Sequence, residues 1–322
     1  MLLIATDEAG YGPKLGPLVI AATVWRLPAK HALRSLETLA TPCRFPGLPK
    51  LSIADSKTIF RPHHSSRLAG LEAIVWAASQ WVWPTETALR LDDWLHSTSR
   101  HDIERLRKIR WFAANQLQQP FPISTPLQPL AAEVAATLQQ TWTARGAELI
   151  DIRQRVLDAK QFNQRCGQGI NKAQLLSETT TALVVELLDQ HPGDDVAVYC
   201  DRHGGRAYYG ALLQHGLPAA TMQVFEESSR ESRYALSIKE RRIEWRFTVK
   251  GDAFGPVSCA SICAKYTRER LMDCFNAYWQ SKHAGQLGPT AGYPGDANRF
   301  LAELQATLER EQVEWDDLVR SR

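Results

Sequence analysis

Apolar positions recur along the chain with two periods, and their order predicts a mixture of strands and helices. Residues 2–6 and 18–25 are apolar runs separated by a glycine-rich turn, which predicts an opening hairpin. Residues 196–200 form a continuous apolar run bounded by turn signals, as expected for a buried central strand. Apolar and polar positions alternate over 232–238 and 242–250, which predicts a second hairpin after a strand at about 219–225.

Longer segments with helical periodicity predict the helices. We expect them over 63–80, 172–190, about 206–215, 256–282 and 295–311. Residues 84–168 differ in character, because helical stretches rich in Trp, Leu and Ala flank a proline-rich segment. The pattern predicts an α/β fold, with a mixed β-sheet flanked by helices and a helical C-terminal portion. Residues 1–83 and 169–322 would form the main domain, and 84–168 a mainly helical insertion.

Composition adds few constraints. The hydrophobic fraction of 44% is that of a globular protein, and a net charge of +3 is too mild to indicate nucleic-acid binding by itself. The six cysteines form no CxxC motif, which is typical of reduced thiols in a cytoplasmic protein. No stretch approaches the roughly 20 apolar residues that a membrane helix needs. We therefore expect a soluble cytoplasmic protein.

Four acidic residues lie at the ends of predicted elements, beside glycine turns. They are Asp7, Glu8, Asp201 and Asp252. Desolvating such carboxylates is costly unless a cation or hydrogen bonds compensate them, and oxygen ligands select Mg²⁺ or Mn²⁺. The alternative is that these residues cap helices or begin turns. Adjacent residues on a strand face opposite ways, so Asp7 and Glu8 could both bind one cation only if the strand ends at Asp7.

Five short motifs occur in order over roughly residues 1–60 and 170–300. They are Asp7–Pro13 with Gly16–Val19, Asp55–Lys57, Val198–Asp201, Lys250–Ala253 with Ala260–Arg268, and Gly292–Asp296. Together they resemble the motifs of type 2 ribonucleases H (ribonuclease HII). The resemblance implies a ribonuclease H-like fold and a two-metal endonuclease that hydrolyses the RNA strand, or embedded ribonucleotides, in RNA/DNA duplexes.

The resemblance also implies roles for particular residues. The metal ligands, for Mg²⁺ or Mn²⁺, would be Asp7, Glu8, Asp201 and Asp252. The Gly10, Tyr11 and Gly12 loop would lie against the sugar at the cut, where close backbone groups can recognise a 2′-OH. Tyr293 would pack on the adjacent sugar.

Two further groups would contact the substrate. Ser56 and Lys57 belong to the Asp-Ser-Lys motif. Ser261, Lys265 and Arg268 fall on one face of a helix and would contact phosphates. An ordinary solvated helix face is the alternative for this row.

The sequence departs from the family pattern at the loop, where Tyr11 replaces the family arginine. An arginine's charge and fork geometry are lost, which puts recognition of a single embedded ribonucleotide in doubt. The basic run 105–110 could touch phosphates or form a solvated helix face. His203 could assist proton transfer or contact a phosphate, or it could be a turn histidine satisfied by backbone groups.

Other readings fit less well. The glycine loop lacks the GK[ST] ending of a nucleotide-binding P-loop, and the nine histidines show no HExxH or paired Cys/His spacing for zinc. No GxSxG nucleophile motif is present. Two alternatives stay open. One is a weak or inactive nucleic-acid-binding protein that keeps the fold, and the other is a related nuclease acting on DNA structures.

Overall fold

The apolar runs at the start of the chain form the hairpin that the sequence predicts. A computed structural model describes residues 1–28, 42–53, 56–60, 66–84, 89–122, 124, 126–144 and 146–321. Strands β1 (Leu2–Ala9) and β2 (Leu18–Arg26) pair antiparallel, with Ala9 opposite Val19. Both strands are almost entirely buried, which explains why their sequences are continuously apolar.

Seven strands form one mixed sheet in the order β5-β2-β1-β6-β9-β8-β7. The additional strands are β5 (Glu148–Leu157), β6 (Val196–Asp201), β7 (Thr221–Glu227), β8 (Glu231–Ile238) and β9 (Arg241–Thr248). Strand β6 is central and runs parallel to both β1 and β9, whereas the β1–β2 and β8–β9 pairs are antiparallel. The predicted buried strand and both predicted hairpins are therefore confirmed.

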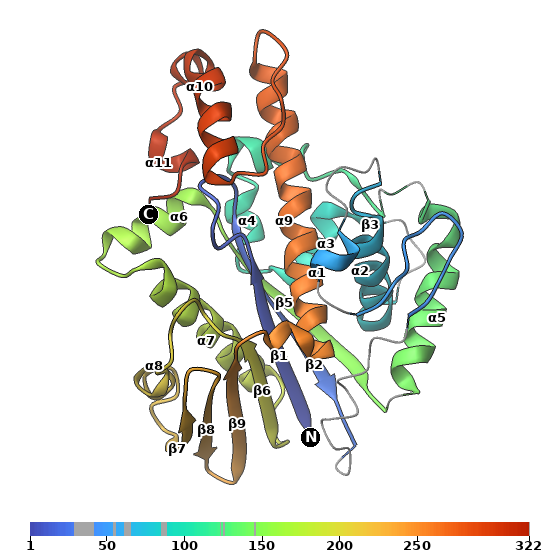
Figure 1. Ribbon diagram of the computed structural model, residues 1–322, viewed down its shortest axis with the longest axis vertical. Helices are drawn as coiled ribbons and strands as arrows, with labels where there is room; N and C mark the ends of the chain where they lie inside the picture. Colours follow the sequence, from blue (N-terminus) through green and yellow to red (C-terminus); the bar gives the residue numbers. More distant parts are fainter. Residues whose placement is uncertain are drawn as a thin grey trace.

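Helices cover both faces of this sheet (Figure 1). One face carries the long α9 (Gly255–Lys282), with α2 (Ala69–Val82) and α5 (Ala131–Thr143) beside it. The other face carries α7 (Lys172–Gln190), against which α8 (Gly210–Gly216) packs. A separate hydrophobic cluster fills each side, with Leu3 on the α9 side and Ile4 on the α7 side. The predicted mixed sheet flanked by helices is confirmed.

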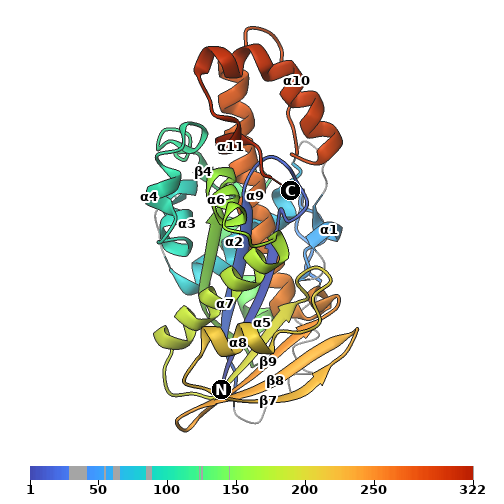
Figure 2. The same cartoon turned by 90° about the vertical axis from the view of Figure 1, so that its left-hand side faces the viewer.

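The C-terminal portion is helical, as predicted, and it returns to the β1–β2 loop. Helices α10 (Pro294–Glu311) and α11 (Trp315–Leu318) lie with the far end of α9 beyond one end of the sheet (Figure 2). After α11 the chain forms a β-bridge between Val319 and Leu15, and the Arg320 N–H donates to the carbonyl of Lys14 at 2.9 Å. The last residues are thus fixed against the loop that follows β1.

The division of the chain at residue 168 needs correction. Residues 84–168 do contain α3 (Leu91–Thr98), α4 (Ile103–Leu106) and α6 (Ala159–Gly167), as well as α5 and two short strands, β3 (Leu89–Arg90) and β4 (Pro120–Phe121). However, they also contain β5, which pairs antiparallel with β2 along its whole length and forms an edge of the main sheet. Four charged side chains interrupt the apolar positions of β5, so the sequence pattern does not predict a strand there.

A buried polar network also joins this region to α9. Glu72 of α2 and Arg270 of α9 are completely buried, and their side chains lie 3.4 Å apart. Tyr266 donates to Glu72 at 2.6 Å, and the backbone N–H of Ser124 donates to the same carboxylate at 2.7 Å. Because these buried side chains bond to one another and to the backbone, the network fixes α2 and the residues near Ser124 against α9.

Two predictions from composition can be compared with the structure. All six cysteines are free thiols, as expected. Within the described ranges, no helix combines the length and apolar character that crossing a bilayer would demand.

Candidate active site at the ends of three parallel strands

Three of the predicted acids lie at one edge of the sheet. Asp7 is near the end of β1, Asp201 is the last residue of β6, and Asp252 lies in the short 3-10 helix η4 (Gly251–Ala253) just after β9. These three strands are parallel neighbours, so their carboxyl ends meet at the same edge. This edge is where ligands bind in open α/β sheets.

Asp7 is a buried carboxylate whose environment opposes its charge. It lies on the α9 face of the sheet, as Leu3 does, and Ser261 of α9 hydrogen-bonds to it. Burial raises the pKa of Asp7 to about 7, although the Ser261 hydrogen bond lowers it, and the charges of Asp201 and Asp252 raise it further. The acids are therefore close enough to repel one another, as expected of groups that share a cation.

Glu8 lies on the opposite face from Asp7. Strand β1 does not end at Asp7 but continues to Ala9, with Glu8 paired regularly opposite Ile20. Alternation along the strand therefore directs Glu8 to the α7 side, away from Ser261. Its pKa is nonetheless raised well above the usual value, first by burial and then by the charges of Asp7 and Asp201. The strand therefore does not end at Asp7, which the arrangement considered from the sequence required.

A tight turn places Asp252 next to Asp201. Lys250 adopts a left-handed conformation, with φ of 59°, and Gly251 packs directly on β6. A Cβ atom on Gly251 would lie 3.0 Å from the Cα of Asp201. The Gly251 N–H donates to Oδ1 of Asp201 at 2.7 Å. Close backbone approach, which glycine permits, thus joins the ends of β6 and β9.

The acidic cluster fits a hard divalent cation by its chemistry. Its donors are carboxylate oxygens, which select Mg²⁺ or Mn²⁺, and a cation would relieve the repulsion that raises the pKa of Asp7. As they stand, the described residues include no group of three or more His, Cys, Asp or Glu side chains that could hold a metal ion. Backbone hydrogen bonds orient two of the acids, because Oδ1 of Asp201 accepts from the Gly251 N–H and Oδ1 of Asp7 accepts from the Glu8 N–H. The second oxygen of each carboxylate would be the one to ligate.

The predicted substrate loop, which follows β1, and Tyr293 lie beside one another. Gly10 has φ of +88°, and a Cβ atom there would lie 2.5 Å from the carbonyl oxygen of Pro17, so only glycine fits without distortion. Tyr293 is 53% exposed, and its ring lies 4.0 Å from the position of a Cβ on Gly12. Tyr11 contacts a cation, because Nζ of Lys172 lies 4.6 Å from its ring centroid.

The predicted row on α9 is not a solvated helix face. Ser261 is buried, and its hydroxyl lies 3.2 Å from that of Ser56 in the short helix α1 (Ser56–Ile59). Arg268 is only 2% exposed and donates to the carbonyl of Ala291 at 2.8 Å. Lys265 is half-buried over the ring of Phe60, at 4.2 Å. Asp55 and the side chain of Lys57, also predicted to take part, lie outside the described residues.

Two other candidates are occupied by structural contacts. His203 is buried, its Nδ1 lies 3.0 Å from Oγ of Ser177, and burial lowers its pKa to about 3. A side chain, and not the backbone, satisfies this ring nitrogen. In the basic run 105–110, Arg105 pairs with Asp102 at 2.9 Å and Arg107 with Asp92 at 2.6 Å. These arginines form intramolecular ion pairs, so they are not available to phosphates as they stand.

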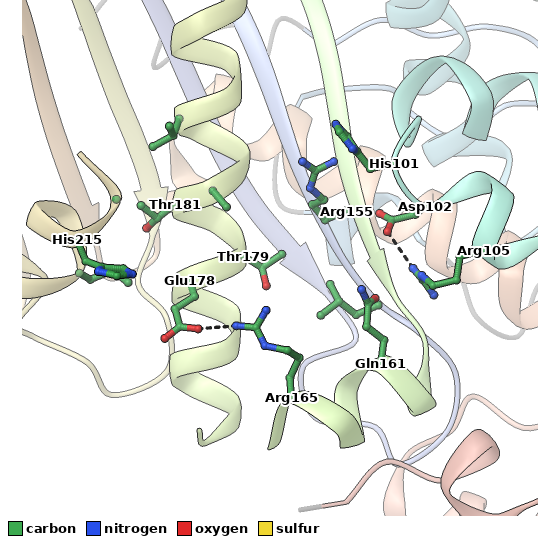
Figure 3. Close-up of a pocket in the computed structure, with 15 residues that line it drawn as sticks. His101, Asp102, Arg105, Arg155, Gln161, Arg165, Glu178, Thr179, Thr181 and His215 are labelled. Carbon is green, nitrogen blue, oxygen red and sulfur yellow. Dashed lines mark hydrogen bonds and ion pairs between the residues drawn. The ribbon is translucent and has the colours of Figure 1, made fainter. Parts of the chain in front are cut away.

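A cavity of about 830 Å³ lies on the α7 side of the sheet and is not lined by the acids (Figure 3). Its arginines are paired with acidic residues. Arg105 contacts Asp102, and Arg165 contacts Glu178 at 2.8 Å. Because these cations are already compensated, the cavity has no excess charge with which to attract a phosphate.

No protein-family model and no curated protein matches the sequence. Solved structures that are similar include the ribonuclease H2 of Pyrococcus horikoshii, with 16% identity, 99% of this chain and 92% of that chain covered, and a TM-score of 0.43. The ribonuclease HII of Archaeoglobus fulgidus, solved in complex with PCNA, is 14% identical, with 100% of this chain and 95% of that chain covered and a TM-score of 0.44. Bst-RNase HIII in complex with Mn²⁺ is 15% identical, with 99% of this chain and 66% of that chain covered and a TM-score of 0.42. This is a distant likeness.

Proposed function

We propose that this protein is a metal-dependent endonuclease that hydrolyses the RNA strand, or embedded ribonucleotides, in RNA/DNA duplexes. The observation that carries the proposal is the meeting of Asp7, Asp201 and Asp252 at the carboxyl ends of β1, β6 and β9, with a raised pKa at Asp7. Carboxylates that repel one another destabilise the folded protein, and such groups occur preferentially at functional sites. The ordered motifs that resemble those of type 2 ribonucleases H name that function.

Asp7, Asp201 and Asp252 would hold Mg²⁺ or Mn²⁺, with Glu8 as a fourth ligand if β1 adjusts locally. The chemistry that such cations supply when bound is activation of water and neutralisation of charge on the leaving 3′-oxygen. Ser261 holds the Asp7 carboxylate in place through its hydrogen bond. It therefore acts as a positioning residue.

The loop at Gly10–Gly12 and the exposed ring of Tyr293 would hold the sugar next to the scissile phosphate. Small glycines allow the backbone to approach a 2′-OH, which can both donate and accept a hydrogen bond. Tyr11 stands where the family has arginine, and it lies beside Lys172. We expect discrimination to rest on backbone contacts and on Tyr293.

The deciding experiment compares cleavage of an RNA/DNA hybrid, a DNA duplex with one ribonucleotide, and an all-DNA duplex, each with Mg²⁺ or Mn²⁺. We expect cleavage of the ribonucleotide-containing duplexes only, and its loss in Asp7→Asn with the fold retained by circular dichroism. Cleavage of the all-DNA duplex would instead identify a nuclease acting on DNA structures.

A protein that binds nucleic acid without cutting it is the second candidate. The hydrogen bond from Gly251 to Oδ1 of Asp201 favours it, because it gives this carboxylate a structural role that needs no cation. Duplex binding without cleavage in either metal would select this candidate, and Asp7→Asn would then leave duplex affinity unchanged or raise it.

A further inference from the structure

A groove of about 900 Å³ runs beside the loop that follows β1. Residues 11–14 of the loop form one wall, the α6–α7 connection forms another, and the last residues of the chain close it. Tyr11 lines the groove and also lies near the acids, because its pKa is raised first by burial and then by the charge of Glu8. The groove therefore adjoins the candidate active site.

Arg320 enters this groove with an incompletely satisfied guanidinium. The residue is 4% exposed, and its Nη1 donates to the carbonyl of Gly10 at 2.7 Å. Its Nε and Nη2 are buried and have no hydrogen-bond partner among the described residues. Arg268, also buried, is near enough for its charge to lower the pKa of Arg320, in addition to the effect of burial. Two guanidinium groups are thus held close together under the loop.

A buried cation with unused donors is costly, because it has lost its hydration without a full set of replacement bonds. The arginines of the cavity in Figure 3 avoid this cost through acidic partners. Lys14 and Lys172 add two further cations to the groove lining, and Asp316 is its single acidic residue. An anion that enters from solvent would therefore meet an excess of positive charge. The unused donors of Arg320 are buried, so its side chain must shift toward the groove for them to reach the anion.

We propose that this groove binds a phosphate group of the nucleic-acid strand, with Arg320 as its principal ligand. The inference rests on the proposed function for its choice of ligand. Guanidinium groups bind phosphate oxygens through paired N–H donors, which would use the Nε and Nη2 of Arg320. Since Nη1 holds the carbonyl of Gly10, a bound phosphate would also fix the loop that faces the scissile sugar.

The first test is thermal unfolding of the full chain in EDTA, with inorganic phosphate replacing chloride at constant ionic strength. We expect phosphate to raise the unfolding midpoint of the wild type, Arg320→Gln to lose this rise, and Arg320→Lys to recover part of it. Arg26→Gln is the matched control, because Arg26 ends β2 far from the loop and pairs with Glu148 on the surface. An equal rise in wild type and Arg320→Gln would overturn the proposal. If Arg320→Gln does not fold, a Lys14→Gln/Lys172→Gln variant should show a smaller rise, and an unchanged rise would refute the site.

The second test measures binding of a labelled RNA/DNA duplex in EDTA over a range of salt concentrations. One lost phosphate contact should reduce the slope of log K against log salt by about 0.9 in Arg320→Gln. A phosphate effect without this change would mean that the site takes free phosphate, which would overturn the assignment to nucleic acid. Because no metal is present, duplex binding can be tested even if the protein does not cut. Cleavage with no effect of Arg320 on binding would refute the groove alone.

Discussion

Asp201 and Gly251 are joined by a hydrogen bond of 2.7 Å, from the backbone N–H of Gly251 to Oδ1 of Asp201. The contact fastens the turn that carries Asp252 to the end of β6. It also holds the Asp201 carboxylate in one orientation. The relative position of two acids in the candidate site therefore depends on a close backbone contact that a side chain at residue 251 would crowd.

Gly251→Ala should disturb this junction. The added Cβ would meet backbone atoms of Asp201 and Cys200 at 3.0 to 3.2 Å, which cannot move as a flexible side chain can. We expect a loss of about 1–3 kcal/mol in the free energy of unfolding, measured in urea, as for other overpacked sites. Gly205→Ala is the control, because nothing lies within 4 Å of its added Cβ. Equal stability of the two variants would show that the junction tolerates displacement.

Asp7 should make the metal-free protein less stable as pH rises. Its pKa is about 7 in the folded protein and 3.8 in an unfolded chain, so the folded state holds its proton more tightly. The contribution to stability is therefore complete below pH 4 and is lost between pH 4 and pH 7, by as much as about 4 kcal/mol. In EDTA, Asp7→Asn should lack this loss and be more stable than the wild type at pH 8. An equal fall in both proteins would rule out Asp7 as its source.

Ser261→Ala should shift the loss of stability that is due to Asp7 to higher pH. The Ser261 hydrogen bond lowers the pKa of Asp7, so its removal should raise that pKa further. The loss of stability with rising pH should then extend to higher pH than in the wild type. Urea unfolding across pH 4–9 measures the shift, and a shift to lower pH would contradict the hydrogen bond.

Much of the fold could be predicted because periodicity reports burial directly. Strand β6 and helix α7 agree closely with their predicted ranges, and β1 begins at the predicted residue but runs to Ala9, three residues beyond its apolar run. Strand β5 was missed for the opposite reason. It is an edge strand whose charged residues find partners elsewhere in the chain, as Arg155 does with Glu186, so its alternation is weak.

The candidate site was predictable only in part. Glycine turns beside the acids predict that the acids lie at strand ends. They do not predict on which face of the sheet each acid lies, because the face of Glu8 depends on β1 continuing to Ala9. Arg320 had no local signal at all. Its place beside Gly10 results from the bridge between Val319 and Leu15, a contact across almost the whole chain.

Arg270→Met should leave Glu72 as a buried acid without its cation. Breaking such a pair costs about 3–5 kcal/mol, because the remaining charge is uncompensated. The double variant Glu72→Leu/Arg270→Met should recover a large part of that loss, since it removes both charges. Urea unfolding of the single and double variants forms a double-mutant cycle. Additive losses would show that the two side chains, although 3.4 Å apart, do not stabilise one another.

Tyr11→Arg should restore a cation to the loop and strengthen duplex binding. In the wild type the ring of Tyr11 lies under Nζ of Lys172, and the charge of Glu8 is near. An arginine would give up the cation–π contact, worth about 0.5–1 kcal/mol, and add a guanidinium facing the groove. We expect the slope of log K against log salt to steepen by about 0.9 for a duplex with one ribonucleotide. Cleavage of that duplex should rise relative to the RNA/DNA hybrid.

Tyr11→Phe keeps the ring and should change neither quantity. If Tyr11→Arg matches Tyr11→Phe in both, the side chain at this position does not take part in substrate choice.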